Sequence, residues 1–298
     1  MGSNFPIAAA AAAVPPHSRR SVMSMGGWAL LIAAGLVAGS ALQARTQVAT
    51  PAPVSACRFE AVGAGRVAKV IDGRSVLLDD GREVRLAAIE VPALPASNET
   101  SALGLVAKTG LEAILADQSV ELRQRGPVAA DRYGRTLAHV TFTRDGAERS
   151  AAHEMLARGY ARVATQVGHP PCAAELLARE RAARAARLGL WAEPHYGVLA
   201  AEGGAELLAE RGRFAVAEGK VMSVRESGGT IYMNFGRRWS EALTVTILKR
   251  HERIFAGAGV QLKALENRRL RVRGWVEERN GPRIEATHPE QIEIAELN

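Results

Sequence analysis

Two β-like runs joined by a tight turn place the strongest constraint on the fold of this chain. Residues 67–78 and 83–91 are rich in aliphatic and β-branched side chains, and Asp79-Asp80-Gly81 lies between them. An Asp-Gly pair between two such runs is typical of a hairpin, because both residues accept the backbone angles of a tight turn. The pattern predicts an antiparallel hairpin at the start of the folded part of the chain.

Four short motifs follow one another in order. They read VIDGRS at 70–75, RLAAIEVPA at 85–93, DRYGRTLA at 131–138 and LGLW at 188–191. Together they resemble the staphylococcal nuclease (thermonuclease) family, whose patterns are V-x-D-G-D-T, R-L-x-x-I-D-x-P-E and D-x-Y-G-R-x-L-A. The resemblance covers about residues 66–191, and the order of four motifs makes it far more specific than any one of them.

The resemblance implies a mainly β fold with added helices (α+β), built on a five-stranded OB-type barrel. Hydrophobic spacing agrees, since it predicts helices at 101–117, 151–158 and 173–188 among the strands. A similar order of strands after residue 213 predicts a second small OB-like β domain. The expected division is 1–45 signal peptide or membrane anchor, 46–65 linker, 66–193 nuclease-like domain, 194–212 linker and 213–298 C-terminal β domain.

The resemblance also implies a site for a phosphodiester. In the family two arginines brace the phosphate, acidic groups hold a calcium ion and a glutamate activates water. Carried over by position, the catalytic candidates are Arg85, Arg135 and Glu90. Tyr133 is a nucleotide contact, and the metal candidates are Glu90 and Asp72.

Two replacements alter that site. Arg74 stands where the family has its first metal acid, and Ala93 stands where it has the glutamate base. A cation at this position repels a divalent ion, so calcium binding is expected to be weak. We expect Arg74 to pair with Glu90 or Asp72 and to join the phosphate-binding set. That set is Arg74, Arg85, Arg135 and Tyr133. Glu99 supplies a base only if its loop folds back.

Two further departures and two other segments bear on function. Thr165 and Val167 replace tyrosines that pack on a nucleotide in the family's founding member. The Arg-rich stretch 179–187 is predicted to be a solvated helix face. Near the end of a C-terminal strand, aromatic and basic side chains are mixed, which suits stacking on bases, although Phe235 and Trp239 are at least as consistent with a core. These side chains are Tyr232, Phe235, Arg237, Arg238 and Trp239.

The N-terminus reads as a targeting segment. Residues 21–44 carry no charge, and Arg19 and Arg20 precede them. A cleaved signal for export is favoured over a retained membrane anchor through residues 21–44. The protein is therefore expected to be periplasmic or secreted, or alternatively anchored in the inner membrane. An exported chain reaches an oxidising compartment, and its only cysteines, Cys57 and Cys172, are expected to form a disulfide rather than two separate thiols.

The first functional hypothesis is an exported thermonuclease-like protein that binds DNA or RNA phosphodiesters, with weak or lost hydrolysis. The net charge of +7, from 38 Lys and Arg against 31 Asp and Glu, mildly favours a polyanionic partner. If the site is active, the resemblance implies a phosphodiesterase. The alternative is a non-catalytic envelope module that binds a protein or a glycan.

Overall fold

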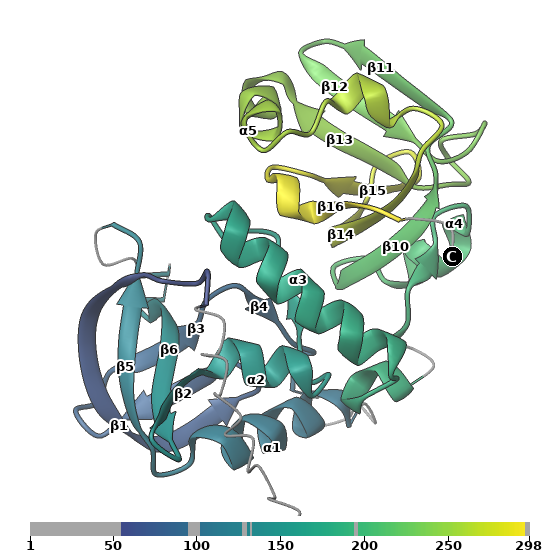
Figure 1. Ribbon diagram of the computed structural model, residues 1–298. Coiled ribbons are helices and arrows are strands. Elements are labelled where there is room, and N and C mark those ends of the chain that lie inside the picture. The colour runs from purple at the N-terminus through teal and green to yellow at the C-terminus, as the bar shows by residue number, and fades with distance from the viewer. Residues whose placement is uncertain (1–54, 95–101, 127–129, 132, 194–195, 296–298) are drawn as a thin grey trace, which may run out of the picture. The chain divides into compact units, whose positions relative to one another are not determined.

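The computed structural model describes residues 55–94, 102–126, 130–131, 133–193 and 196–295 (Figure 1). They belong to one compact unit that spans residues 53–298. Two hydrophobic cores lie within it, one built from side chains between Val67 and Tyr196 and the other from side chains between Ala201 and Ile292. The expected targeting segment, 1–45, falls outside the described residues. Of the helices that the structure describes, none is long and apolar enough to cross a membrane.

The first sheet is a barrel. Its strands follow the order β3-β2-β1-β5-β6-β7, and an additional pairing between β3 and β6 closes five of them into a ring. That closing pair is parallel, whereas the other neighbours are antiparallel. The strands are β1 (Glu60–Asp72), β2 (Ser75–Leu78), β3 (Glu83–Leu86), β5 (Ser119–Gln124), β6 (Thr136–Arg144) and β7 (Ala147–Ser150). The predicted α+β class with a five-stranded barrel is confirmed.

The first predicted strand is divided in the structure. Residues 67–78 were expected to form one strand, but the chain turns at Gly73 and Arg74 and divides the run between β1 and β2. The turn packs tightly against α1 (Leu103–Leu115), because a Cβ at Gly73 would lie 2.6 Å from the Cβ of Ala107. A glycine is therefore required there.

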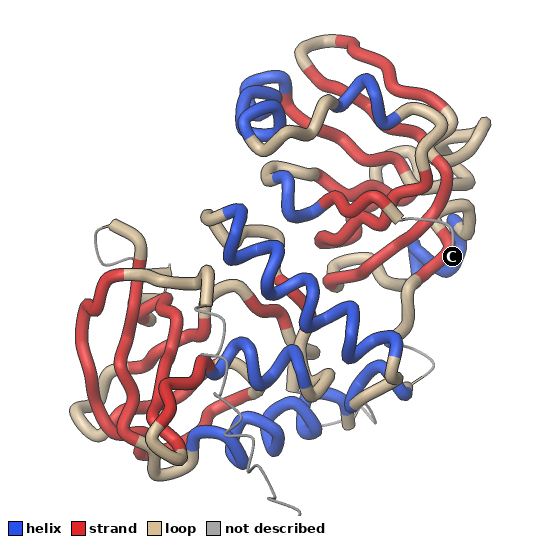
Figure 2. Tube along the Cα trace, viewed as in Figure 1, coloured by secondary structure: helices blue, strands red, loops and turns tan. Residues whose placement is uncertain are grey.

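Helices group on one side of the first barrel, as Figure 2 shows. They are α1, α2 (Ala151–Ala157) and α3 (Pro170–Ala185), and the 3-10 turn η1 (Gly189–Ala192) follows them. A short pair of strands, β4 (Ile89–Glu90) and β8 (Arg162–Val163), runs antiparallel beside this group. Helix α3 begins with prolines in its first turn, and the His169 side chain accepts a hydrogen bond from the Cys172 amide at 3.4 Å, so both features favour the observed start.

The predicted disulfide is confirmed. Cys57 and Cys172 are bonded, which ties the segment ahead of β1 to the first turn of α3. The bond closes a loop across 115 positions of sequence. A disulfide that closes a long loop typically stabilises a fold by about 2–4 kcal/mol, because it restricts the unfolded chain.

The second sheet repeats the strand order of the first. It runs β11-β12-β13-β15-β14-β10-β9, with β16 added on β14, and β13 pairs with β15 in parallel. The first predicted strand of this part, 214–225, is two strands in the structure, β10 (Phe214–Lys220) and β11 (Ser223–Ser227), joined through Val221 and Met222. Strand β10 pairs with β14, and β11 pairs with β12. The order around this sheet therefore returns to its starting strand, as in an OB barrel.

The elements of this second sheet have the following bounds. The strands are β9 (Leu199–Ala200), β10 (Phe214–Lys220), β11 (Ser223–Ser227), β12 (Thr230–Asn234), β13 (Thr244–Leu248), β14 (Arg269–Glu278), β15 (Pro282–Glu285) and β16 (Ile292–Ile294). The helical segments are α4 (Gly204–Ala209), η3 (Lys249–His251), α5 (Glu252–Gly257), η4 (Leu262–Leu265) and η5 (Pro289–Gln291).

A half-buried histidine beneath the N-terminal segment leads to a prediction about acid stability. The ring of His139 stacks on Phe59, with ring centroids 4.1 Å apart. Burial, followed by the charge of His153, lowers the pKa of His139 from 6.5 to about 4. The unfolded chain therefore binds the proton first as the pH falls, and stability is lost between about pH 6.5 and pH 4. For this partly exposed ring the loss is about 2–3 kcal/mol.

His139→Phe is expected to remove most of that loss, since phenylalanine keeps the stacking and does not titrate. Urea unfolding at pH 7, 5.5 and 4.5 measures the effect. His139→Gln is the control, because it also abolishes titration but lowers stability at every pH by losing the stacked ring. A natural protein that is equally stable at pH 7 and pH 4.5 would contradict the prediction.

Candidate functional site

The three predicted phosphate arginines lie on neighbouring strands of the first barrel. Strand β3 carries Arg85 and pairs with β2 on one side and β6 on the other. Arg74 directly precedes β2, and its carbonyl accepts a hydrogen bond from the Leu86 amide at 2.7 Å. Arg135 directly precedes β6, whose first residue pairs with Val84. The strand register thus brings together backbone segments that lie up to 61 positions apart in sequence, from 74 to 135.

Arg74 is bound to the carboxylate of Glu90. Its Nη1 forms an ion pair with Glu90 Oε2 and donates a hydrogen bond to the Ile89 carbonyl at 3.2 Å. Only 14% of the Arg74 side chain and 15% of the Glu90 side chain are exposed. Burial raises the pKa of the Glu90 carboxyl, and the neighbouring guanidinium opposes that rise. The pair is therefore desolvated, and the Arg74 guanidinium helps the Glu90 carboxylate to remain charged.

Asp72 has a different role from the one expected of a metal ligand. Its Oδ1 accepts a hydrogen bond from the Arg74 amide at 2.8 Å, so the carboxylate closes the turn between β1 and β2. Such a contact is typical of aspartate in turns. Asp72 fixes the backbone of Arg74, whereas Glu90 fixes its side chain.

Arg135 is held by two carboxylates. Its Nε donates to Asp131 Oδ2 at 2.7 Å, and its Nη1 lies 3.5 Å from Glu83 Oε1. The side-chain hydrogen bond raises the pKa of Arg135 and lowers the pKa of Asp131. The Arg135 guanidinium also lies 5.1 Å from the ring centre of Tyr133, which is 66% exposed. Tyr133 and Arg135 therefore present an exposed aromatic ring beside a fixed cation.

Arg85 differs from the other two arginines. It is half-buried and shares one face of β3 with Glu83, since alternate residues of a strand point to the same side. Across the described residues, its guanidinium has no hydrogen bond or ion pair. Within the described structure, the Arg85 guanidinium can therefore donate hydrogen bonds to a ligand without breaking an existing contact.

The residues present do not fit the calcium ion that the motifs imply. Calcium takes about six to eight oxygen ligands, and here the Glu90 carboxylate and the Ile89 carbonyl are both bound to a guanidinium. The position of the first metal acid carries that cation itself. A divalent ion would have to displace Arg74 and would then lie beside its charge.

Other predicted positions are not brought into this group. Ala93 is exposed and offers no proton acceptor, and Glu99 lies outside the described residues. Val167 is buried, and its amide donates to Glu290 Oε1 at 2.6 Å. Glu83 and Asp131, by contrast, were assigned no role from the sequence. Their positions are the only sequence signals that they belong to the site: Asp131 is the first residue of the third motif, and Glu83 lies two residues before Arg85.

The aromatic and basic cluster of the second sheet is divided by the fold. Phe235 is 1% exposed and belongs to the core, which agrees with the core position considered as the alternative to base stacking. Trp239 is 61% exposed, and Arg237 and Arg238 are exposed beside it. Tyr232 is half-buried on β12. The exposed part of the cluster is therefore Trp239 with two arginines.

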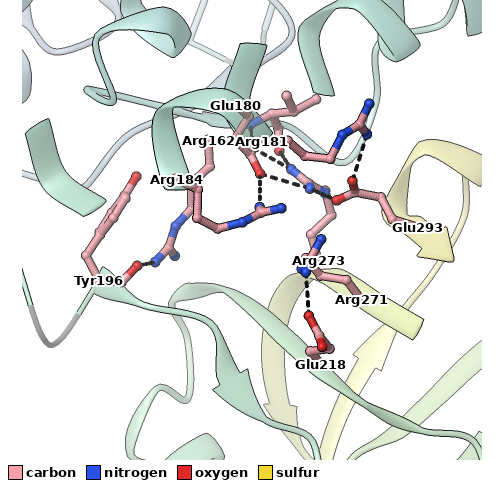
Figure 3. Close-up of polar contacts among 10 residues, drawn as sticks. Arg162, Glu180, Arg181, Arg184, Tyr196, Glu218, Arg271, Arg273 and Glu293 are labelled. Carbon is pink, nitrogen blue, oxygen red and sulfur yellow. Dashed lines mark hydrogen bonds and ion pairs between the residues drawn. The ribbon is translucent and has the colours of Figure 1, made fainter. Parts of the chain in front are cut away.

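A buried ion network joins α3 to the second sheet (Figure 3). Arg273 of β14 is fully buried and donates to Glu180 at 2.6 Å and 3.1 Å, and also to Glu293. Glu180 further accepts from Arg184 at 2.9 Å and from the Val163 amide at 2.6 Å. Burial acts to raise the pKa of the Glu180 carboxyl, but the charge and hydrogen bonds of Arg273, the Val163 amide and the charge of Arg184 together lower it.

The predicted solvated face of 179–187 is therefore wrong at Glu180 and Arg184. The Glu180 side chain is completely buried and that of Arg184 is 15% exposed. Glu180 pairs with the fully buried Arg273 of β14, and Arg184 pairs with Glu180. Arg179 and Arg181 do keep 41% and 49% of their side chains exposed.

Comparison with known families gives one match. Residues 83–193 match the family model described as staphylococcal nuclease homologue. The matched segment begins at β3 and ends after η1, so it includes Arg85, Glu90 and Arg135, whereas Arg74 precedes it. No curated protein matches the chain.

Proposed function

We propose that this chain, which carries a staphylococcal nuclease homologue domain at residues 83–193, binds the phosphodiester backbone of nucleic acids with weak or lost hydrolysis. We further propose that it acts after export, which its disulfide supports because such bonds persist in oxidising compartments. The proposed phosphate site consists of Arg74, Arg85 and Arg135, with Tyr133 as a stacking surface.

The observation that carries the proposal is the contact of Arg74 with Glu90 and the Ile89 carbonyl. A guanidinium occupies the oxygens that a metal ion would need. Because arginine is always charged and donates in a planar fork, it offers a phosphate both attraction and directed hydrogen bonds without an ion. We therefore assign to Arg74 the positive charge of the site.

The charges around the site set an expectation for affinity. Arg74 pairs with Glu90, and Arg135 pairs with Asp131 and Glu83, so the three arginines and these three carboxylates are together formally neutral. A phosphate must compete with those carboxylates at Arg74 and Arg135, whereas it meets no such competitor at Arg85 among the described residues. Binding is therefore expected to be modest and to depend chiefly on Arg85.

The same residues indicate that hydrolysis of a phosphodiester is slow. Hydrolysis of a phosphodiester needs a group that accepts a proton from water and a cation that stabilises the developing charge. Ala93 offers no proton acceptor at the position of the base, and Glu90 is bound to Arg74. What remains is a cradle that orients a phosphate and has no positioned base within the described residues.

Arg85→Ala is expected to weaken binding to a labelled oligonucleotide and to reduce the salt dependence. Loss of one phosphate contact reduces the magnitude of the slope of log K, where K is the binding constant, against log salt concentration by about 0.7 for a single strand and about 0.9 for a duplex. Fluorescence anisotropy across a salt series measures both quantities. Arg149→Ala is the matched control, since Arg149 lies on β7 and is 41% exposed.

Two outcomes would decide against the proposal. Equal slopes for the natural protein and Arg85→Ala would remove Arg85 from the interface. Absence of nucleic-acid binding, together with salt-insensitive binding to an envelope protein or glycan, would favour the alternative function of a non-catalytic envelope module.

A further inference from the structure

The disulfide lies against a buried histidine. Cys172 is completely buried at the start of α3, and the Cys57 Sγ lies 3.4 Å from Nε2 of His153. His153 comes from α2 and is 8% exposed. The imidazole of His153 thus contacts the disulfide through the Cys57 sulfur, which is itself bonded to the Cys172 sulfur.

The other ring nitrogen of His153 faces a carboxylate. Its Nδ1 lies 3.6 Å from Glu175 Oε1. An ionised carboxylate only accepts hydrogen bonds, so Glu175 favours a ring proton on Nδ1, which leaves the lone pair on Nε2, the nitrogen beside the Cys57 sulfur.

Glu175 is itself held in place. Its Oε2 accepts hydrogen bonds from the Ser55 hydroxyl at 3.0 Å and the Ala56 amide at 2.8 Å. Its Oε1 accepts from Arg179 at 3.1 Å. Ligand atoms of Cys57, His153 and Glu175 lie within 4.8 Å of one another. Because both carboxylate oxygens already have donors, Glu175 is suited to orient the imidazole rather than to bind a metal itself.

We propose that reduction of the Cys57–Cys172 bond creates a site for a thiophilic divalent cation such as Zn²⁺. The ligands are the thiolates of Cys57 and Cys172 and the Nε2 of His153. Two thiolates and one imidazole are a known zinc ligand set, and a carboxylate on the far nitrogen of the histidine is its usual support. The metal then holds the N-terminal segment to α3 in place of the disulfide.

The reaction balances with a dithiol as the reductant. The dithiol gives two electrons and two protons to the cystine and becomes a cyclic disulfide, while Cys57 and Cys172 become thiols. Binding of the cation then releases the two thiol protons, since thiolates are the ligands. Oxidation by a disulfide of the same class reverses both steps and expels the metal.

Cobalt is a suitable probe because its spectrum reports its ligands. Full-length protein is reduced with a dithiol, desalted without oxygen and titrated with Co²⁺. We expect one equivalent to bind, with a thiolate-to-cobalt charge-transfer band in the near ultraviolet and intense visible bands of tetrahedral cobalt. Zn²⁺ should displace it, and the unreduced protein should show none of these bands.

Variants separate the proposed roles. His153→Gln should lose the tetrahedral spectrum, and Glu175→Gln should weaken binding about 10- to 100-fold while it keeps the same bands. His251→Gln, outside the cluster, should change nothing. The proposal is overturned if the reduced protein binds no stoichiometric cobalt, if the unreduced protein binds equally well, or if both variants match the natural chain. Should His153→Gln fail to fold, the affinity of Glu175→Gln still decides the matter.

Discussion

Replacement of Glu180 by alanine is expected to lower the free energy of unfolding by about 3–5 kcal/mol, the cost of removing one partner from a buried ion pair. Arg273 is fully buried and donates two hydrogen bonds to Glu180. Without that carboxylate, Glu293 is the remaining acid on Arg273, and it is shared with Arg181. The Val163 amide also loses its acceptor. The fold then retains a buried cation with too little opposite charge.

Urea unfolding of Glu180→Ala beside the natural chain measures this effect. The matched control is the double variant Glu180→Met with Arg273→Met, which removes both charges and keeps the volume filled. It is expected to be much more stable than Glu180→Ala, because replacing both members of a buried pair by apolar groups is often nearly neutral. A Glu180→Ala protein within about 1 kcal/mol of the natural chain would contradict the account of this network.

The double variant Arg74→Asp with Ala93→Glu is expected to gain calcium-dependent cleavage by at least about 10²-fold over the natural chain, the lower range for a positioned general base. Aspartate at 74 supplies a hard oxygen and releases Glu90 and the Ile89 carbonyl from the guanidinium. Glutamate at 93 restores a proton acceptor. Calcium then has its oxygen ligands and water has its base.

Single variants test whether both parts are needed. Arg74→Asp alone should bind calcium and cleave slowly, and Ala93→Glu alone should cleave no faster than the natural chain, because Arg74 still holds Glu90. Rates with labelled oligonucleotide, with calcium and with chelator, give the comparison. If the double variant stays as slow as the natural chain, the frame of the site has been misassigned.

Much of the first barrel could be predicted because its signals are local. The hairpin at Asp79-Asp80-Gly81 and the ordered motifs define the strands, and an even number of cysteines in a chain expected to be exported favours the disulfide. The turn at Gly73 was missed because β-like residues lie on both sides of it. Asp72 closes this turn locally, and the close approach of Ala107, 34 positions away from 73 to 107, requires the glycine.

The ion network could not be predicted for a related reason. Glu180 and Arg273 are 93 positions apart, and a helix with many arginines is ordinarily a solvated surface. No local pattern distinguishes Arg184, turned inward, from Arg181, which remains half-exposed. In the site, the sequence leaves two carboxylates, Glu90 and Asp72, as partners for the Arg74 side chain. In the structure the side chain pairs with Glu90, whereas Asp72 accepts a hydrogen bond from the Arg74 amide.

The measurement that tests the central proposal most directly is oligonucleotide binding and cleavage by the natural protein across a calcium titration, with and without chelator. If Arg74 supplies the positive charge of the site, affinity will be the same in calcium and in chelator, and cleavage will remain slow in both. Brisk calcium-dependent cleavage that chelator abolishes would contradict this account and would place a metal ion where we assign Arg74.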